Sequence, residues 1–168
     1  MDWRGKIRGM IAAFTGIFLL AACTVVHSPP GTTTTVILLR HADRAPFQSD
    51  LNEKGVARAK ALPAAVADLD INVIYSPDKK RNLDTVAPLI AERGIELRVI
   101  EVSDVAKRLV EENPGKTVIW VGNTDNLQTV YGLLGGRGHP PNNYGDLFVM
   151  QIGENGPPKI EMRHFGPE

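Results

Sequence analysis

The sequence predicts an α/β fold with a mostly parallel central sheet, because short apolar runs alternate with longer helical patterns. The runs contain few polar residues, which is typical of strands that are covered on both faces. Helices on both faces would make a three-layer α/β/α sandwich. The expected strands are 36–39, 73–75, 97–100 and 118–121, the expected helices lie near 52–68, 79–93, 104–112 and 126–134, and 146–152 with 159–164 should form a closing hairpin.

Capping and turn residues support these helices. Asn52 can cap the first helix, and Gly94 and Gly115 stand where helix ends need a left-handed residue. Pro63 and Pro88 fall inside the first two expected helices. Because proline lacks the backbone donor and clashes with the preceding turn, we expect kinks or boundaries there.

The first 22 residues differ from the rest of the chain and resemble a secretory signal. Three basic residues precede an apolar run over 10–22, which is too short to cross a membrane and ends in Leu20-Ala21-Ala22-Cys23. Small residues before a cysteine are typical of a lipobox. We therefore expect residues 1–22 to be a lipoprotein signal peptide, the alternative being a buried core helix with an incidental cysteine.

Cys23 is the only cysteine, so no internal disulfide can form, and lipidation fits this context better than redox chemistry. By resemblance to bacterial lipoproteins, Cys23 becomes an acylated N-terminus that anchors a periplasm-facing protein in the cell envelope. Thr24 resembles the residue found in lipoproteins sent to the outer membrane. Residues 23–33 are polar and turn-forming, which predicts a tether, so the folded domain is expected over 34–168.

The charges of the chain balance, with 19 basic and 19 acidic side chains. Neither nucleic acid nor an anionic membrane surface is therefore expected as an electrostatic partner, and any selectivity for anions must be local. The sequence has neither a zinc-type ligand spacing nor a Walker loop, so we expect no metal and no cofactor.

A cluster of charged residues directly follows the first expected strand: Arg40-His41-Ala42-Asp43-Arg44-Ala45-Pro46. It places a ring that can act as a nucleophile between two permanent cations. A phosphoryl group carries about two negative charges, and guanidinium forks match its oxygens. The alternative is a solvated loop with a satisfied histidine. Ligands of such sheets bind beyond the carboxyl ends of the strands, where Arg40, His41, Ser76 and Asn123 are all expected to lie.

Three later motifs occur in the order typical of one known family: Tyr75-Ser76-Pro77 with Arg81 and Thr85, Gly122-Asn123-Thr124-Asp125, and Leu134-Gly135-Gly136. With the first cluster, they resemble the histidine phosphatase superfamily, also called phosphoglycerate mutase-like, over nearly all of 34–165. The resemblance implies a metal-independent hydrolase in which His41 attacks phosphorus and becomes a phosphohistidine. It also implies that Arg40 and Arg81 clamp phosphate, and that Arg44 adds a third contact, as in the acid phosphatase branch.

One position departs from the family pattern, because Asn123 stands where the family has its second histidine. Asparagine keeps a hydrogen-bond donor but can neither be cationic nor pass a proton. No proton donor for the leaving oxygen is obvious, and Asp125 and Asp43 are the candidates. The expected function is removal of phosphoryl groups from a phosphorylated small molecule or phosphoprotein. The alternative is a catalytically impaired pseudo-phosphatase that binds phosphorylated ligands or a partner protein.

Overall fold

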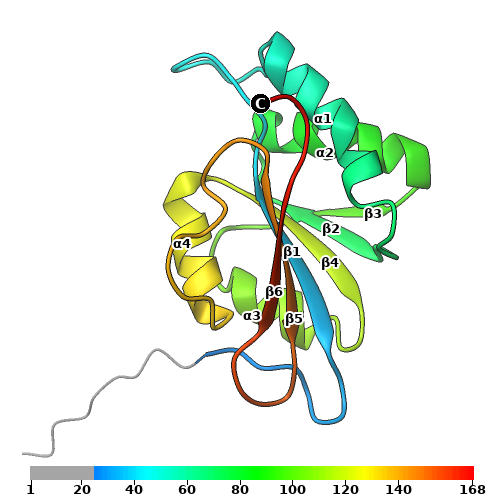
Figure 1. The fold of residues 1–168 in the computed structure, drawn as a ribbon, viewed down its shortest axis with the longest axis vertical. Helices are drawn as coiled ribbons and strands as arrows, with labels where there is room; N and C mark the ends of the chain where they lie inside the picture. Colours follow the sequence, from blue (N-terminus) through cyan, green and yellow to red (C-terminus); the bar gives the residue numbers. More distant parts are fainter. Residues whose placement is uncertain (1–24) are drawn as a thin grey trace, which may run out of the picture.

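Six strands form one mixed sheet in the order β3-β2-β4-β1-β5-β6 (Figure 1). The computed structural model describes residues 25–168, so the expected signal peptide and Cys23 lie outside the described residues. Within 25–168, no helix has both the length and the apolar character needed to cross a bilayer. The elements are β1 (Thr34–Arg40), α1 (Glu53–Ala65), β2 (Val73–Ser76), α2 (Lys80–Arg93), β3 (Glu96–Val99), α3 (Val105–Glu111), β4 (Thr117–Gly122), α4 (Thr124–Leu133), β5 (Asp146–Ile152) and β6 (Lys159–His164).

The sheet is parallel on one side and antiparallel on the other. Strand β1 lies in the middle and pairs in parallel with β4, which pairs in parallel with β2, and β2 with β3. On its other edge β1 pairs antiparallel with β5, and β5 with β6. The predicted helices, strands and closing hairpin are therefore confirmed to within a few residues at their ends.

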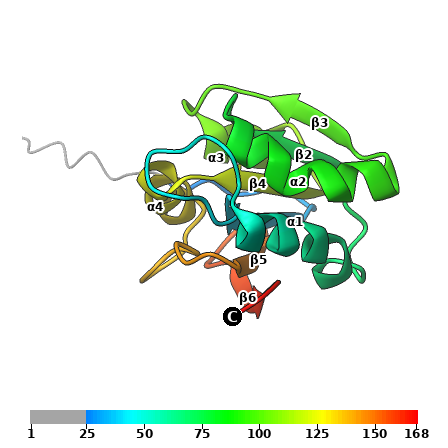
Figure 2. The ribbon, with the colours of Figure 1, turned by 90° about the horizontal axis from the view of Figure 1, so that it is seen from above.

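Helices cover both faces of the sheet, which confirms the three predicted layers (Figure 2). Side chains alternate along β1, so Val36 and Leu38 pack under α3 and α4, whereas Ile37 and Leu39 pack under α1 and α2. All four are completely buried. The continuous apolar run that predicted this strand thus reflects burial on both faces.

One detail of the prediction is wrong. The third expected strand, 97–100, is predicted to be covered on both faces, but β3 is the sheet edge, and Val99 is half exposed. At Pro88 a kink or a boundary is expected, and the structure has no boundary there, because Pro88 lies inside α2. Buried Val86 and Leu89 on either side of Pro88 hold this stretch against the sheet, so packing overrides the local penalty. Near Pro63 a boundary does follow, because α1 ends at Ala65.

The start of α1 is fixed against the loop that follows β1. Asn52 caps the helix as predicted, since its side-chain oxygen accepts from the Gly55 N–H at 2.8 Å. The Asn52 N–H donates to the Asp43 carbonyl at 3.0 Å. A Cβ atom at Gly55 would lie 2.0 Å from that same carbonyl oxygen, so only glycine permits this close approach. At the end of α2, Gly94 has the predicted left-handed conformation, with φ of 64°.

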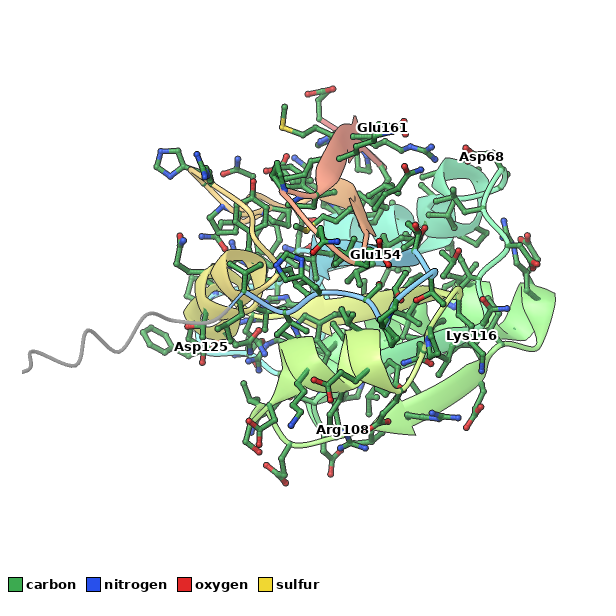
Figure 3. The ribbon with its side chains drawn as sticks, turned by 90° about the horizontal axis from the view of Figure 1, so that it is seen from below. Asp68, Arg108, Lys116, Asp125, Glu154 and Glu161 are labelled. Carbon is green, nitrogen blue, oxygen red and sulfur yellow. The ribbon has the colours of Figure 1, made fainter. Side chains whose placement is uncertain are left out.

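The segment before β1 makes hydrogen bonds to the domain. The Val26 N–H donates to the Leu133 carbonyl at 2.8 Å, and the Ser28 hydroxyl donates to the Ile152 carbonyl at 2.7 Å. Nearby, the Glu154 carboxylate accepts from the Gly31 N–H at 2.8 Å. Glu154 is labelled in Figure 3, which views the molecule from below. Local composition could not predict these contacts, because their partners lie more than 100 residues away.

A buried arginine joins the C-terminal tail to the loop after β1. Arg58 on α1 is 2% exposed, and its Nε donates to the Asp43 carboxylate at 2.6 Å. Its Nη atoms donate to the carbonyls of Phe165 at 2.5 Å and Pro167 at 2.7 Å. One side chain therefore holds three segments that are distant in the sequence.

Replacing Arg58 by methionine should strongly destabilise the protein. The Arg58→Met variant leaves the Asp43 carboxylate buried without its partner, and breaking such a pair typically costs about 3–5 kcal/mol. The matched control is Arg108→Met, which breaks an exposed pair with Glu112 on α3 and should cost about 0.5 kcal/mol or less. Urea unfolding measures both values. Equal losses in the two variants would contradict the role given to Arg58.

Candidate active site

His41 lies directly beyond β1, and its ring is held in one tautomer. Its backbone N–H donates to the Gly122 carbonyl at 3.0 Å, which ties it to the end of β4. The ring Nδ1 lies 2.8 Å from the Ala42 carbonyl oxygen. Since a carbonyl only accepts, Nδ1 must carry the proton, and Nε2 then holds the free electron pair. Nε2 is the atom that a nucleophilic histidine needs.

The surroundings of His41 keep its ring neutral. The side chain is 2% exposed, and its pKa is lowered from 6.5 to about 4, with burial as the main cause. The hydrogen bond to Ala42 opposes this shift, and the positive charges of Arg40, Arg81 and Arg44 contribute to it. At neutral pH the ring is therefore uncharged and surrounded by cations.

Arg40 is held beside His41 by the loop between α4 and β5. Its Nη1 donates to the Asn142 carbonyl at 3.0 Å, and its Nη2 donates to the Tyr144 hydroxyl at 3.2 Å. The guanidinium carbon also lies 4.0 Å from the centre of the Tyr144 ring, a cation–π contact. These contacts leave the Nε–H of Arg40 buried without a hydrogen-bond partner among the described residues.

Arg44 organises the loop that it belongs to. Its Nη1 donates to the carbonyls of Ala45 at 3.2 Å and Gln48 at 3.1 Å. The Nε–H of Arg44, like that of Arg40, is buried without a partner within residues 25–168. Buried donors without acceptors are costly and rare in proteins. Two of them on arginines beside the same histidine therefore indicate an acceptor that the protein itself does not provide.

Arg81 comes from the first turn of α2 and contacts Asn123 at the end of β4. Its Nε and Nη2 both donate to Asn123 Oδ1, at 3.0 and 2.7 Å. Burial lowers the pKa of Arg81, and the charges of Arg44 and Arg40 lower it further, whereas Asp125 opposes the shift. Since Arg81 fixes the amide oxygen, the Nδ2 donor of Asn123 faces the other way, and the rest of the Arg81 fork stays free.

Thr85 links the two halves of this arginine cluster. Its hydroxyl accepts from the Ala42 N–H at 2.8 Å and donates to the Arg81 carbonyl at 2.7 Å. The threonine that follows Arg81 in the sequence motif thus fixes the His41 loop against α2. Ser76 does not join them, because its buried hydroxyl donates to the carbonyl of Pro77 at 2.9 Å.

The two predicted proton donors lie in different settings. Asp43 is paired with Arg58 inside the protein, so its carboxylate supports the loop and is not placed to donate a proton. Asp125 is exposed in the first turn of α4, where it faces solvent (Figure 3). Among residues 25–168, no three His, Cys, Asp or Glu side chains gather in the manner of a metal site.

Sequence reasoning missed Tyr144, which lies at the centre of this arrangement. Besides contacting Arg40, its ring is 5.7 Å from the ring of His41, measured between centroids. Its position depends on the fold of the loop between α4 and β5, and no motif marks it. From the sequence, only the general ability of a tyrosine hydroxyl to form hydrogen bonds could have suggested that Tyr144 belongs to the site.

A comparison with known families agrees with this geometry. The model described as the histidine phosphatase superfamily, branch 1, matches residues 36–102, a stretch that includes His41 and Arg81. This part of the chain is therefore similar to the histidine phosphatase superfamily. The match ends before Asn123.

Solved structures of other phosphatases are similar in fold over 77–80% of this chain. SixA of Agrobacterium tumefaciens is 22% identical, with a TM-score of 0.55 over 80% of this chain and 98% of that one. The protein histidine phosphatase SixA complexed with tungstate is 17% identical, with a TM-score of 0.53 over 77% and 96%. A mycobacterial glucosyl-3-phosphoglycerate phosphatase with inorganic phosphate is 14% identical, with a TM-score of 0.54 over 80% and 97%. No curated protein sequence matches the chain significantly.

The ring of His41 should titrate far below an ordinary histidine. An NMR pH titration of the folded protein should show a His41 midpoint near pH 4 rather than 6.5. Because the unfolded chain binds this proton more readily, His41 should also make stability fall as the pH falls from about 6.5 toward 4. The His41→Gln variant should lose that part of the slope. A midpoint near 6.5 would contradict the buried, cation-surrounded site.

Proposed function

We propose that this protein is a phosphatase that removes phosphoryl groups through a phosphohistidine on His41. The observation that carries the proposal is the pair of buried, unpartnered Nε–H groups on Arg40 and Arg44 beside a neutral His41. A phosphoryl group supplies the acceptors that these donors lack, and its charge of about minus two suits a site with three guanidinium groups.

The proposed reaction has two steps. In the first, the electron pair of His41 Nε2 forms a bond to phosphorus while the bond from phosphorus to the ester oxygen breaks. In the second, water attacks the phosphohistidine, the nitrogen–phosphorus bond breaks, and inorganic phosphate leaves. Covalent catalysis of this kind divides one difficult displacement into two easier ones. Arg40, Arg44 and Arg81 would neutralise the oxygens in both steps.

Two structural neighbours that were solved with anions support the proposal. One neighbour was solved with tungstate and another with inorganic phosphate, both tetrahedral anions. One is named as a protein histidine phosphatase and the other as a phosphatase of a small sugar ester. The proposal therefore covers phosphoproteins and phosphorylated small molecules alike.

Removing the His41 ring tests the proposal. The full-length protein in detergent should hydrolyse p-nitrophenyl phosphate without added metal, and the His41→Ala variant should fall to the background rate. The matched control is His139→Ala, because His139 lies in a separate hollow with Phe148, Met162 and Arg163. Phosphate release in a continuous assay measures all three. Equal activity in wild type and His41→Ala would defeat the proposal, as would a loss confined to His139→Ala.

Asn123 favours one alternative, a protein that binds phosphorylated ligands without turning them over. Its amide holds Arg81 but cannot supply the positive charge of a second histidine. The same assay separates the two functions when calorimetry with phosphate accompanies it. Phosphate binding without turnover, together with activity gained in Asn123→His, would select the binding protein. Turnover in the wild type that needs His41 would select the phosphatase.

We also propose that Cys23 anchors the protein to the outer membrane on its periplasmic side. Val26, which is bonded to the end of α4, lies three residues after Cys23. At about 3.5 Å per residue, at most about 10 Å of chain would separate the anchor from the domain. Helix α4 begins at the His41 edge of the sheet and ends beside Val26, so the site would face away from the lipid.

Mass spectrometry of the N-terminal peptide, purified from a bacterial host, tests the anchor. The mature protein should begin at Cys23 and carry the added mass of acyl chains, and the Cys23→Ala variant should not be modified. A Thr24→Ala variant is the matched control and should keep the acyl chains. An unmodified Cys23 in the wild type would overturn this proposal without affecting the phosphatase assay.

A further inference from the structure

We propose that the Tyr144 hydroxyl donates the proton to the leaving oxygen when His41 attacks phosphorus. This inference rests on the proposed phosphatase function and assigns the acid that the reaction needs. An alkoxide or phenoxide is a poor leaving group, and a positioned acid typically contributes about 10² to 10⁴ in rate. The sequence suggested only Asp43 and Asp125 for this role.

The placement of Tyr144 brings its hydroxyl among the groups of the site. The oxygen accepts from Arg40 Nη2 at 3.2 Å, and its ring centroid lies 5.7 Å from that of His41. Arg40 ends β1, His41 follows it, and Tyr144 comes from the loop before β5, so the loop brings a hydroxyl to the end of β1.

The hydrogen-bond pattern at Tyr144 suits a proton donor. Arg40 Nη2 can only donate, so the phenol oxygen accepts from it and the phenol proton remains free for another acceptor. Within residues 25–168, no acceptor for this proton is found. The side chain is partly exposed, which lets a substrate oxygen reach it.

The loop that carries Tyr144 is held in place at both ends. Arg40 Nη1 binds the Asn142 carbonyl at 3.0 Å, and the Phe165 N–H binds the Gly145 carbonyl at 2.9 Å. Gly145 has a φ of 91° and lies against Arg58 and His164, where a side chain would clash. The hydroxyl is therefore preorganised and need not be ordered by the substrate.

The proton balance of the step is complete. As the His41 Nε2–phosphorus bond forms, the ester oxygen leaves phosphorus with the bonding pair and takes the proton from Tyr144. The alcohol departs, and the phenolate that remains is stabilised by the charge of Arg40. When water attacks the phosphohistidine, the phenolate takes a proton from that water, which restores both Tyr144 and His41.

The two carboxylates lie in poorer positions for this step. Asp43 Oδ2 accepts from Arg58 Nε at 2.6 Å inside the protein, so this carboxylate already has a buried partner. Asp125 is exposed on the first turn of α4, and the structure gives it no hydrogen bond to His41, Arg40 or Arg44. Tyr144, by contrast, has a hydroxyl that is hydrogen-bonded to Arg40 and keeps its own proton free for a substrate oxygen.

The Tyr144→Phe variant tests this assignment because it removes the hydroxyl but keeps the ring against Arg40. The readout is kcat/KM for phenyl phosphate and p-nitrophenyl phosphate, which reports the step that releases the alcohol. Phenolate needs protonation much more than p-nitrophenolate does. We expect a loss of about 10²-fold for phenyl phosphate and little change for p-nitrophenyl phosphate.

Two further variants separate proton donation from a structural role. Tyr131→Phe removes a hydroxyl that donates to the Arg137 carbonyl outside the arginine cluster, and it should leave kcat/KM unchanged for both substrates. Asp125→Asn should either leave kcat/KM unchanged or lower it equally for both substrates. An equal loss for both substrates in Tyr144→Phe, or a selective loss in Asp125→Asn, would overturn the assignment. If the wild type hydrolyses neither ester, the proposed function fails instead.

Discussion

Three guanidinium groups gathered around one neutral imidazole are the constraint on which the rest of this structure depends. Arg40, Arg44 and Arg81 repel one another, and their combined charge together with burial holds the pKa of His41 near 4. Only a rigid scaffold keeps such charges together without a carboxylate between them. Two acidic side chains of the same loop are paired elsewhere, Asp43 with buried Arg58 and Asp50 with Lys80. The site thereby keeps its positive charge for an anion that comes from outside.

The scaffold achieves this by joining segments that are far apart in the sequence. Strand β1 brings Arg40 and His41 to the carboxyl edge of the sheet, where Asn123 follows the neighbouring strand β4. Thr85 then fastens the loop after β1 to the helix that carries Arg81. The members of the cluster come from β1, the loop after β1, α2 and the end of β4. Strands β1 and β4 and helix α2 pack in the two apolar cores.

Local patterns predicted the parts of the site that depend on strand ends, and they failed where distant segments meet. The apolar run before Arg40 and the parallel sheet together place Arg40 and Asn123 at one edge, because parallel strands end on the same side. Tyr144 has no such signal, since it reaches the cluster only through a loop closed by contacts about 100 residues away. The exposed edge strand β3 was misjudged for the same reason, because strand order is a property of the whole sheet.

The most direct test of the account is a crystal structure of the protein with vanadate, which imitates phosphorus during displacement. The account predicts vanadium bonded to His41 Nε2, with its oxygens accepting from Arg40, Arg44 and Arg81 and one apical oxygen beside the Tyr144 hydroxyl. Vanadate bound elsewhere, or a His41 site in which these arginines contact different anions, would contradict it.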